Sequence, residues 1–368
     1  MSGPVRTGTR PRGSCWGSLM DLSFVAVFGD LIANPLLLAV LVLVLAVIIV
    51  NGATDAANAI ATVVGTRCMP PGAAIVMAAV CNFFGLLIMT LVSTAVADTI
   101  SHMVNFGGDA HEALVALCAA MIAIVVWGVT AWYFGIPTSQ SHSLIAGLTG
   151  AAIAIEGFTA GVNWWEWMKV LYGLVISTVL GFALGWLIAR CFSRLFARVS
   201  RPASERFFTG AQICSAAFLA FMHGAQDGQK FMSIAMMAIM LELGVTGQPA
   251  EYPLWIMLMC SLTMAVGTGM GGKRIIKSVA MQMTKLEKYQ GFSASLAAAL
   301  SILLATLTGL PVSTTHTSTT AIMGVGAEKR FSSVKWSTAK DMAMTWVATF
   351  PGCGLLGFVL AKLFMMLL

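Results

Sequence analysis

The chain has 368 residues, of which 58% are apolar and only 10% are charged, and its mean hydropathy is +0.87. Soluble domains carry roughly 25% charged residues, so this composition excludes a soluble protein and indicates an all-α protein that crosses a membrane many times. The net charge of +6 does not indicate nucleic-acid binding, because the basic residues lie in short segments between apolar runs.

Ten apolar runs follow an N-terminal lead, 1–21, that we expect to be disordered, and each is about as long as a spanning helix requires. Two runs exceed one simple helix, and we expect each to be broken by a polar cluster, at Asn51–Asn58 and at His223–Lys230. Two others begin with Gly-x-Pro and a hydroxyl run, which predicts half-helices in hairpin-like, re-entrant elements. The runs are 33–66, 73–96, 113–134, 135–155, 168–189, 208–241, 254–270, 292–309, 310–327 and 341–366.

The loops between these runs predict the orientation of the chain. Lys and Arg cluster in 190–206, 271–290 and 328–340, whereas 97–112 and 242–253 contain neither. Cytoplasmic loops carry an excess of Lys and Arg, so we expect the first three loops inside and the other two outside. Only the lead, with its three arginines, disagrees with this count.

Two motifs occur once in each half of the chain. NGATDAANAI at 51–60 aligns with HGAQDGQKFM at 223–232, and GIPTSQSHSLIAGLTG at 135–150 aligns with GLPVSTTHTSTTAIMG at 309–324. Each half holds five expected crossings, an odd number, so we expect two inverted repeats, 22–190 and 208–368, joined by a basic cytoplasmic linker, 191–207. Inverted repeats with broken helices are typical of secondary transporters, which bind substrate where the repeats meet.

The first motif places a carboxylate, Asp55 or Asp227, at the same depth in each half. An ionisable group within a span is costly and therefore functional by default. Asn51 and Asn58 flank Asp55 with oxygen donors suited to Na⁺, or to a carboxylate that is protonated. The glycine three residues before each aspartate is expected to let the backbone unwind. The structural alternative is an aspartate paired with a lysine from elsewhere.

The second motif begins a helix with hydroxyl groups in both halves. Two facing half-helix N-termini, with free N–H groups and hydroxyls, would hold an oxyanion. The alternative is that Ser and Thr bond back to their own helix in a kinked span. His142 and His316 in these runs either protonate and donate to the anion or are structural histidines bonded to a nearby carbonyl.

These motifs resemble those of the bacterial type of the inorganic phosphate transporter (PiT) family. GATDAANA at 52–59 is similar to the family's GANDVANA signature, and Pro311–Thr317, with a weaker copy at Pro137–Ser143, is similar to its PVSTTHS element. HGAQDGQK at 223–230 and GGKRIIK at 271–277 are similar to bacterial members. The resemblance implies an alternating-access symporter of the inner (plasma) membrane, often a homodimer, that moves inorganic phosphate with Na⁺ or H⁺ through the lipid bilayer.

The resemblance also implies roles for individual residues. Phosphate would lie between two triplets, Ser139, Gln140 and Ser141 on one side and Ser313, Thr314 and Thr315 on the other. The coupling ions would lie by Asp55, Asn58 and Asn51, and by Asp227. No cofactor or metal other than a bound Na⁺ is expected, and no catalytic residues, because no span contains a nucleophile–base pair or a metal-ligand motif.

The second half departs from the family signature. Gln226 stands where the signature has Asn, and Lys230 stands where the first half has Asn58. Lys230 either pairs with Asp227 in place of a second cation or reaches the phosphate directly. We expect Lys230, Gln226, His142 and His316 to modulate transport. A sulfate symporter of the same fold is the alternative function; an anion channel is disfavoured, since a passive pore gains nothing from buried carboxylates.

Overall fold

The computed structural model describes residues 22–367 apart from 23, 108, 135–137, 246–248, 250, 283–285 and 335. The expected lead and the Gly-Ile-Pro of the first half lie outside the described residues. Within them the fold is helical, and an isolated bridge between Val104 and Val162 is the only strand-like pairing. The helices are α1 (Phe24–Ala33), α2 (Pro35–Gly65), α3 (Pro71–Val92), α4 (Ala95–His102), α5 (Ala110–Phe134), α6 (Gln140–Ala160), α7 (Trp164–Leu195), α8 (Arg201–Glu242), α9 (Leu254–Gln282), α10 (Lys288–Leu307), α11 (Thr314–Lys329) and α12 (Trp336–Leu367), with a 3₁₀ turn at Phe331–Ser333.

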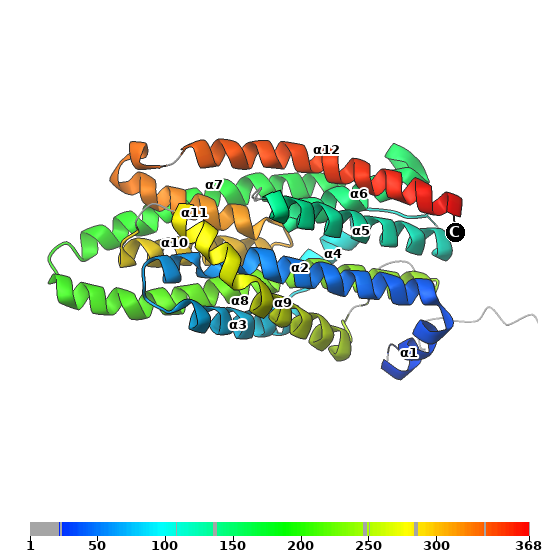
Figure 1. Cartoon of the computed structure of the whole chain (residues 1–368), viewed down its shortest axis with the longest axis horizontal. Coiled ribbons are helices and arrows are strands. Elements are labelled where there is room, and N and C mark those ends of the chain that lie inside the picture. Colours follow the sequence, from blue (N-terminus) through cyan, green and yellow to red (C-terminus); the bar gives the residue numbers. More distant parts are fainter. Residues whose placement is uncertain are drawn as a thin grey trace, which may run out of the picture.

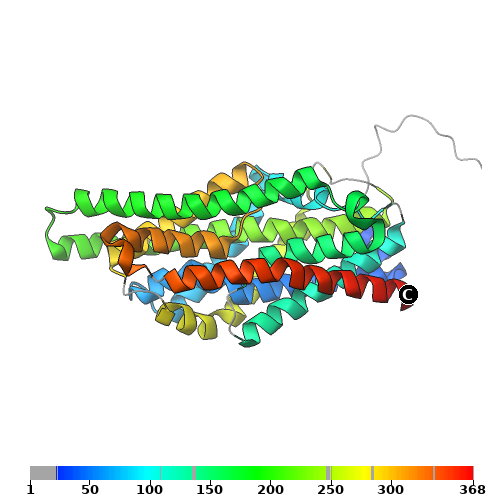
Figure 2. The same ribbon diagram turned by 90° about the horizontal axis from the view of Figure 1, so that it is seen from above.

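The long helices run nearly along the longest axis of the molecule, as Figures 1 and 2 show. Among the described residues, eight helices are long and apolar enough to cross a membrane, and α9 adds a shorter apolar stretch, Leu254–Met270. The expected all-α, multi-pass architecture is therefore confirmed. The bounds differ from expectation in places: 73–96 divides into α3 and α4, α9 continues past 270, and α1 was not foreseen.

Helix starts follow local signals in the sequence. Asn34 accepts hydrogen bonds from the N–H groups of Leu36 and Leu37, with Pro35 as the first residue of α2. Asn163 begins α7 in the same way. Asn accepts the N–H bonds that a helix start leaves open, and proline fits the first turn because it has no N–H to satisfy.

Two helical hairpins occupy opposite halves of the long axis. Figure 1 shows α5 and α6 in one half and α10 and α11 in the other, with the starts of α6 and α11 near the middle. The long helix that follows each hairpin packs on the hairpin of the other half, because α7 lies on α11 and α12 lies on α6. The expected hairpins are thus present, and α6 and α11 begin at the hydroxyl runs. α6, with 21 residues, is long enough to cross a membrane and is not a half-helix.

Equivalent glycines of the two halves make equivalent close contacts. A Cβ atom at Gly150 in α6 would overlap the backbone carbonyl of Gly354 in α12, and one at Gly324 in α11 would overlap that of Phe182 in α7. Small residues let helix backbones approach closely in a membrane, where van der Waals packing drives association. The alignment pairs Gly150 with Gly324, so each hairpin is held by the same device, as the repeat predicts.

The breaks expected in the two longest runs are not found. α2 is one helix from Pro35 to Gly65 and α8 is one helix from Arg201 to Glu242. Their glycines serve packing instead of unwinding: Gly52 lies against the backbone of α9 at Met264 and Thr268, and Gly224 lies against the backbone of α3 at Asn82. The polar clusters therefore project side chains, not free carbonyl groups, toward the middle of the molecule.

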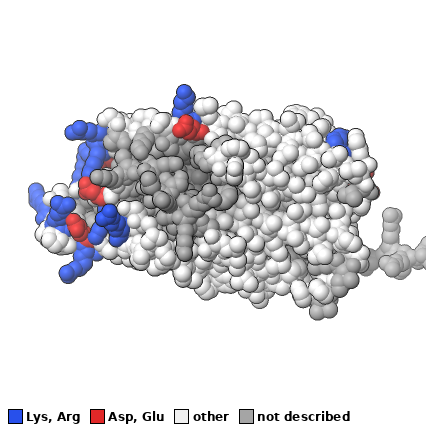
Figure 3. Space-filling view, in the orientation of Figure 1, with Lys and Arg blue, Asp and Glu red and all other residues white. Residues whose placement is uncertain are grey.

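Basic residues gather at one end of the molecule. Figure 3 shows Lys and Arg at the end where α7 finishes and α8 begins, and Arg198 and Arg201 are exposed there. The connection expected at 191–207 is mostly helical, since only 196–200 separate the two helices. α8 has 42 residues and so carries the chain about 63 Å away from that end. Residues of the two loops that contain no Lys or Arg, 97–112 and 242–253, line one common cavity, Asn105 and Val245 among them.

Candidate functional site

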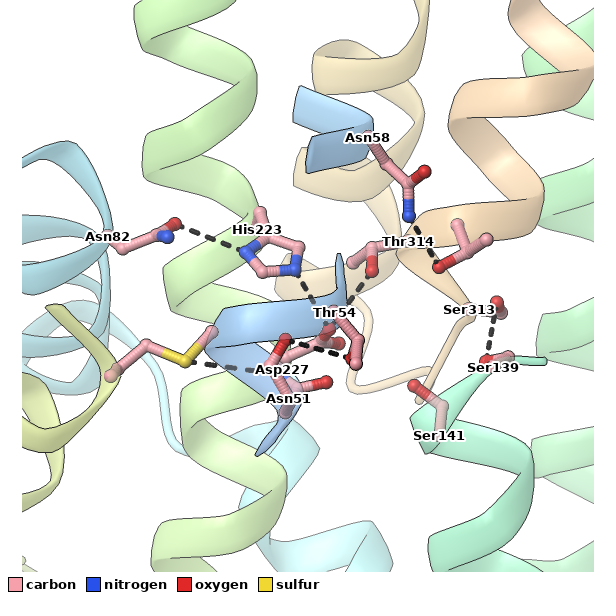
Figure 4. Close-up of polar contacts among 12 residues, drawn as sticks. Asn51, Thr54, Asn58, Asn82, Ser139, Ser141, His223, Asp227, Ser313 and Thr314 are labelled. Carbon is pink, nitrogen blue, oxygen red and sulfur yellow. Dashed lines mark hydrogen bonds and ion pairs between the residues drawn. The ribbon is translucent and has the colours of Figure 1, made fainter. Parts of the chain in front are cut away.

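The starts of α6 and α11 meet in the middle of the molecule. The Ser313 hydroxyl donates to the Ser139 hydroxyl across a 2.8 Å hydrogen bond (Figure 4), and each serine is the residue before the first helical turn. The two triplets expected around the anion are all buried, with exposed fractions from 0% to 8%. The structure therefore brings together the six predicted positions, Ser139, Gln140, Ser141, Ser313, Thr314 and Thr315.

These two helix starts offer hydrogen-bond donors toward a common point. The first N–H groups of a helix have no partner within it and carry a partial positive charge. The Ser313 hydroxyl accepts from the N–H of His316, whereas the Ser139 side chain makes no such bond, so α6 is not capped by its own side chain. Facing N-termini lined with hydroxyl groups can bind an oxyanion.

An ion pair on α8 lies beside the hydroxyl groups. Asp227 Oδ1 is 2.8 Å from Lys230 Nζ, and its Oδ2 accepts from the Thr314 hydroxyl at 3.0 Å. Lys230 also donates to the Ser141 hydroxyl at 2.7 Å and to the carbonyl of Val312. The pairing expected from the i, i+3 spacing is confirmed. Lys230 also contacts Ser141, one of the predicted phosphate ligands, and a direct contact between Lys230 and phosphate stays a prediction.

The two aspartates lie in one cluster and not in two separate sites. Ligand atoms of Asp55, His223 and Asp227 lie within 4.8 Å of one another, and His223 Nε2 is 3.3 Å from Asp227 Oδ2. Two unit charges at such a distance interact by about 3–4 kcal/mol at an effective dielectric constant of about 20. Two neighbouring carboxylates therefore need positive charge between or beside them. The coupling-ion positions expected by Asp55 and by Asp227 therefore lie next to each other, and their role in binding cations stays a prediction.

The amides near Asp55 face different neighbours. Asn58 Nδ2 donates to the Thr315 hydroxyl at 3.0 Å, which joins α2 to the start of α11. Asn51 Nδ2 lies 3.8 Å from the sulfur of Met264, and its Oδ1 is buried without a hydrogen-bond partner. A buried acceptor without a partner is costly, and a cation beside Asp55 would satisfy it. Thr54 instead bonds back to the carbonyl of Val50 on its own helix.

Gln226 supports the hairpin and does not reach the serines. Its Nε2 donates to the carbonyl of Leu310 at 2.9 Å, and its Oε1 accepts from the Thr306 hydroxyl at 2.6 Å. Thr306 lies in the last turn of α10 and Leu310 in the connection to α11, so the amide helps to fix the position from which α11 starts. In the other half, Gln140 Oε1 is buried without a partner.

His142 and His316 contact one another with tilted rings, each in the first turn of its helix. Their ring centroids are 4.5 Å apart, and the rings also contact Trp346 and Phe350 of α12, at 3.9 Å for His316–Trp346 and 5.1 Å for His142–Phe350. His142 Nδ1 and His316 Nε2 are buried without hydrogen-bond partners. The pair therefore forms an aromatic layer behind the serines, and its modulating role stays a prediction.

Sequence reasoning missed a polar chain that holds His223. Asn82 of α3 pairs its Oδ1 with His223 Nδ1 at 3.2 Å (Figure 4) and donates from Nδ2 to the Thr268 hydroxyl of α9 at 2.8 Å. Asn82 is fully buried. The sequence contains one indication of this contact, because Asn82 is a single amide in an otherwise apolar run. A buried polar side chain needs a hydrogen-bond partner.

Comparison with known proteins identifies the family. The chain matches the phosphate transporter family over residues 51–357. It is 37% identical to a protein of Bacillus subtilis (strain 168) described as a probable low-affinity inorganic phosphate transporter, over 88% of this chain and 96% of that one. A protein of Rhizobium meliloti (strain 1021) with the same description is also 37% identical, over 88% and 95% of the two chains.

A solved structure shares the fold. The structure titled "The sodium-dependent phosphate transporter" superposes with a TM-score of 0.82 at 22% identity, over 91% of this chain and all of that one. The sequence match covers both repeated motifs and most of the described helices. The chain belongs to the phosphate transporter family, as its motifs predict.

Proposed function

We propose that the chain is a symporter that carries inorganic phosphate, driven by Na⁺ or H⁺, by alternating access where its two halves meet. Membership of the phosphate transporter family supports phosphate as the cargo. The multi-pass fold and the relatives' descriptions as transporters support transport across a membrane without a chemical step. The inner (plasma) membrane as its location and a homodimer as its assembly are part of the same proposal.

One observation carries the proposal: the hydrogen bond of 2.8 Å between Ser139 and Ser313, which joins two helix starts from opposite halves. An anion bound there interacts with both halves at once. Phosphate offers several acceptor oxygens, and hydroxyl and N–H groups of Ser139, Gln140 and Ser141 face those of Ser313, Thr314 and Thr315 at this point. Movement of one half against the other would then open the site to alternate sides of the membrane.

The neighbouring carboxylates supply a reason for cation coupling. Asp55 is 3% exposed, and its charge lies within a few ångströms of that of Asp227. Asn51 and Asn58 offer amide oxygens on the same helix as Asp55. A Na⁺ ion or a proton at Asp55 would offset the negative charge that arrives with phosphate. Binding of the cation therefore favours binding of the anion, which is the energetic basis of symport.

The test is uptake of labelled phosphate into vesicles that contain the purified protein, with Na⁺ and pH gradients imposed separately. A symporter accumulates phosphate above equilibrium only when one gradient is present. Uptake that follows the phosphate gradient and membrane potential alone indicates a channel and refutes the proposal. Excess sulfate as competitor distinguishes the two anions, since a sulfate symporter would lose phosphate uptake to it.

A further inference from the structure

The two halves make the same contact with chemically different residues. Asn58 of α2 donates to Thr315 at the start of α11, and Lys230 of α8 donates to Ser141 at the start of α6. The motif alignment pairs Asn58 with Lys230 and Ser141 with Thr315. One position of the duplicated site is therefore occupied by a neutral amide and its counterpart by an ammonium group.

The ammonium group of Lys230 is fully engaged. It has three N–H donors, and these meet Asp227, Ser141 and the carbonyl of Val312. The side chain is 0% exposed, so water does not compete for these bonds. Lys230 thus connects α8, the start of α6 and the segment before α11, and it occupies the space next to Asp227 that a bound cation would need.

Charges in the cluster leave one negative charge to be balanced. Asp55 and Asp227 contribute two, and Lys230 removes one. Asn51, Thr54 and Asn58 are all neutral, so no side chain of the aligned motif neutralises Asp55 as Lys230 neutralises Asp227. His223 lies beside the carboxylates, with its Nδ1 next to the Asn82 amide oxygen and its Nε2 next to Asp227.

We infer that Lys230 is a tethered cation that takes the place of a second coupling ion, so that a single mobile cation, at Asp55, accompanies each transported phosphate through this cluster. The inference rests on the proposed symport and specifies its stoichiometry. Because the same ammonium contacts Ser141, it also holds one predicted anion ligand in place without a mobile cation at Asp227.

The experiment measures the charge moved per phosphate, from the potential at which phosphate-coupled current reverses in vesicles. Lys230→Asn restores the first-half residue and leaves both carboxylates without a fixed cation. The charge per phosphate should rise by one, with the phosphate Kd at saturating cation changed by less than about tenfold. Lys169→Asn is the matched control, because Lys169 forms an i, i+3 pair with Glu166 at 2.7 Å on α7, away from the site. The charge moved per phosphate by this variant should equal that of the wild type.

Removing one partner of a buried ion pair leaves an uncompensated charge, which can prevent Lys230→Asn from folding. Two further variants keep the test decisive in that case. Asp227→Asn should lower the charge per phosphate by one. The double variant Asp227→Asn/Lys230→Asn should return it to the wild-type ratio. These values follow only if fixed charge and mobile cations substitute for one another.

Three results would overturn the inference. The charge moved per phosphate could be unchanged in Lys230→Asn, or that of the double variant could differ from the wild-type value. The phosphate Kd of Lys230→Asn could also rise by more than about a hundredfold. The last result would make Lys230 a direct ligand of phosphate. A wild-type protein without any dependence on a cation gradient would instead refute the proposed symport, so the two failures are distinguishable.

Discussion

Replacement of Ser313 by alanine tests the anion site most directly. In the described structure its hydroxyl has two roles: it donates to Ser139 at 2.8 Å, and it accepts from the N–H of His316 at 3.2 Å. When phosphate binds, the hydroxyl can rotate and donate to the anion. Ser313→Ala removes that donor from a buried site where water cannot replace it.

The two roles have separate costs. Loss of the helix cap destabilises the protein by about 1 kcal/mol. Loss of a hydrogen bond to a buried charged partner costs about 1–3 kcal/mol of binding free energy, which raises the phosphate Kd by roughly 5- to 150-fold. Thr314→Ala should weaken binding in the same range, since its hydroxyl lies at the same helix start and 3.0 Å from Asp227.

Calorimetric titration of the purified protein with phosphate measures the Kd, and thermal unfolding measures the cost of the cap. Ser301→Ala is the matched control: Ser301 is fully buried in α10 and its hydroxyl bonds the carbonyl of Ala297 on its own helix. Its phosphate Kd should equal that of the wild type. An unchanged Kd in both Ser313→Ala and Thr314→Ala would refute the hydroxyl-lined anion site.

Three other outcomes follow from the arrangement of helices and charges. A cysteine replacing the exposed Asn105 should react with an impermeant thiol reagent outside the cell, and one replacing the exposed Ser200 should not; labelling of both from outside contradicts the inverted repeat. Gly150→Ala should destabilise the protein by about 1–3 kcal/mol in thermal unfolding, because its Cβ would meet Gly354. Gly210→Ala, which faces open space, should not, and equal melting temperatures would contradict the close packing. Asp55→Asn should abolish the stimulation of phosphate uptake by a cation gradient, and stimulation that persists would exclude Asp55 as the cation ligand.

Local signals predicted where α6 and α11 begin and that their starts would meet. A hydroxyl run after Gly-x-Pro marks a helix start whatever surrounds it, and the opposite orientation expected for the two halves implied that the starts would face each other. The hydrogen bond between Ser139 and Ser313 realises that expectation. The repeated motif therefore placed these two serines together without knowledge of the packing, and their role in binding an anion stays a prediction.

Continuity of α2 and α8 could not be predicted from the same kind of signal. A glycine in a polar cluster permits an unwound backbone, and it equally permits close approach of another helix. The neighbours decide: Gly52 lies against α9 and Gly224 against α3, and neither contact is visible in the local sequence. Asn82 was missed for the same reason, since its partner His223 is 141 residues away.

Lys230 makes one contact that the sequence predicts and two contacts that depend on the fold. Its distance from Asp227 follows from helix geometry, because residues three apart share a face. Its other two bonds reach Ser141 and Val312, 89 and 82 residues away, and these link the ion pair to both hairpins. Helix spacing alone left two interpretations of Lys230, as a substitute for a cation or as a ligand of the anion. It predicted a partner for only one of the three N–H donors of the ammonium group. With all three donors assigned, the ammonium neutralises a carboxylate and holds an anion ligand simultaneously. A duplicated fold can thus keep matching contacts in its two halves while its charge differs between them, and that difference determines how many mobile cations the site requires.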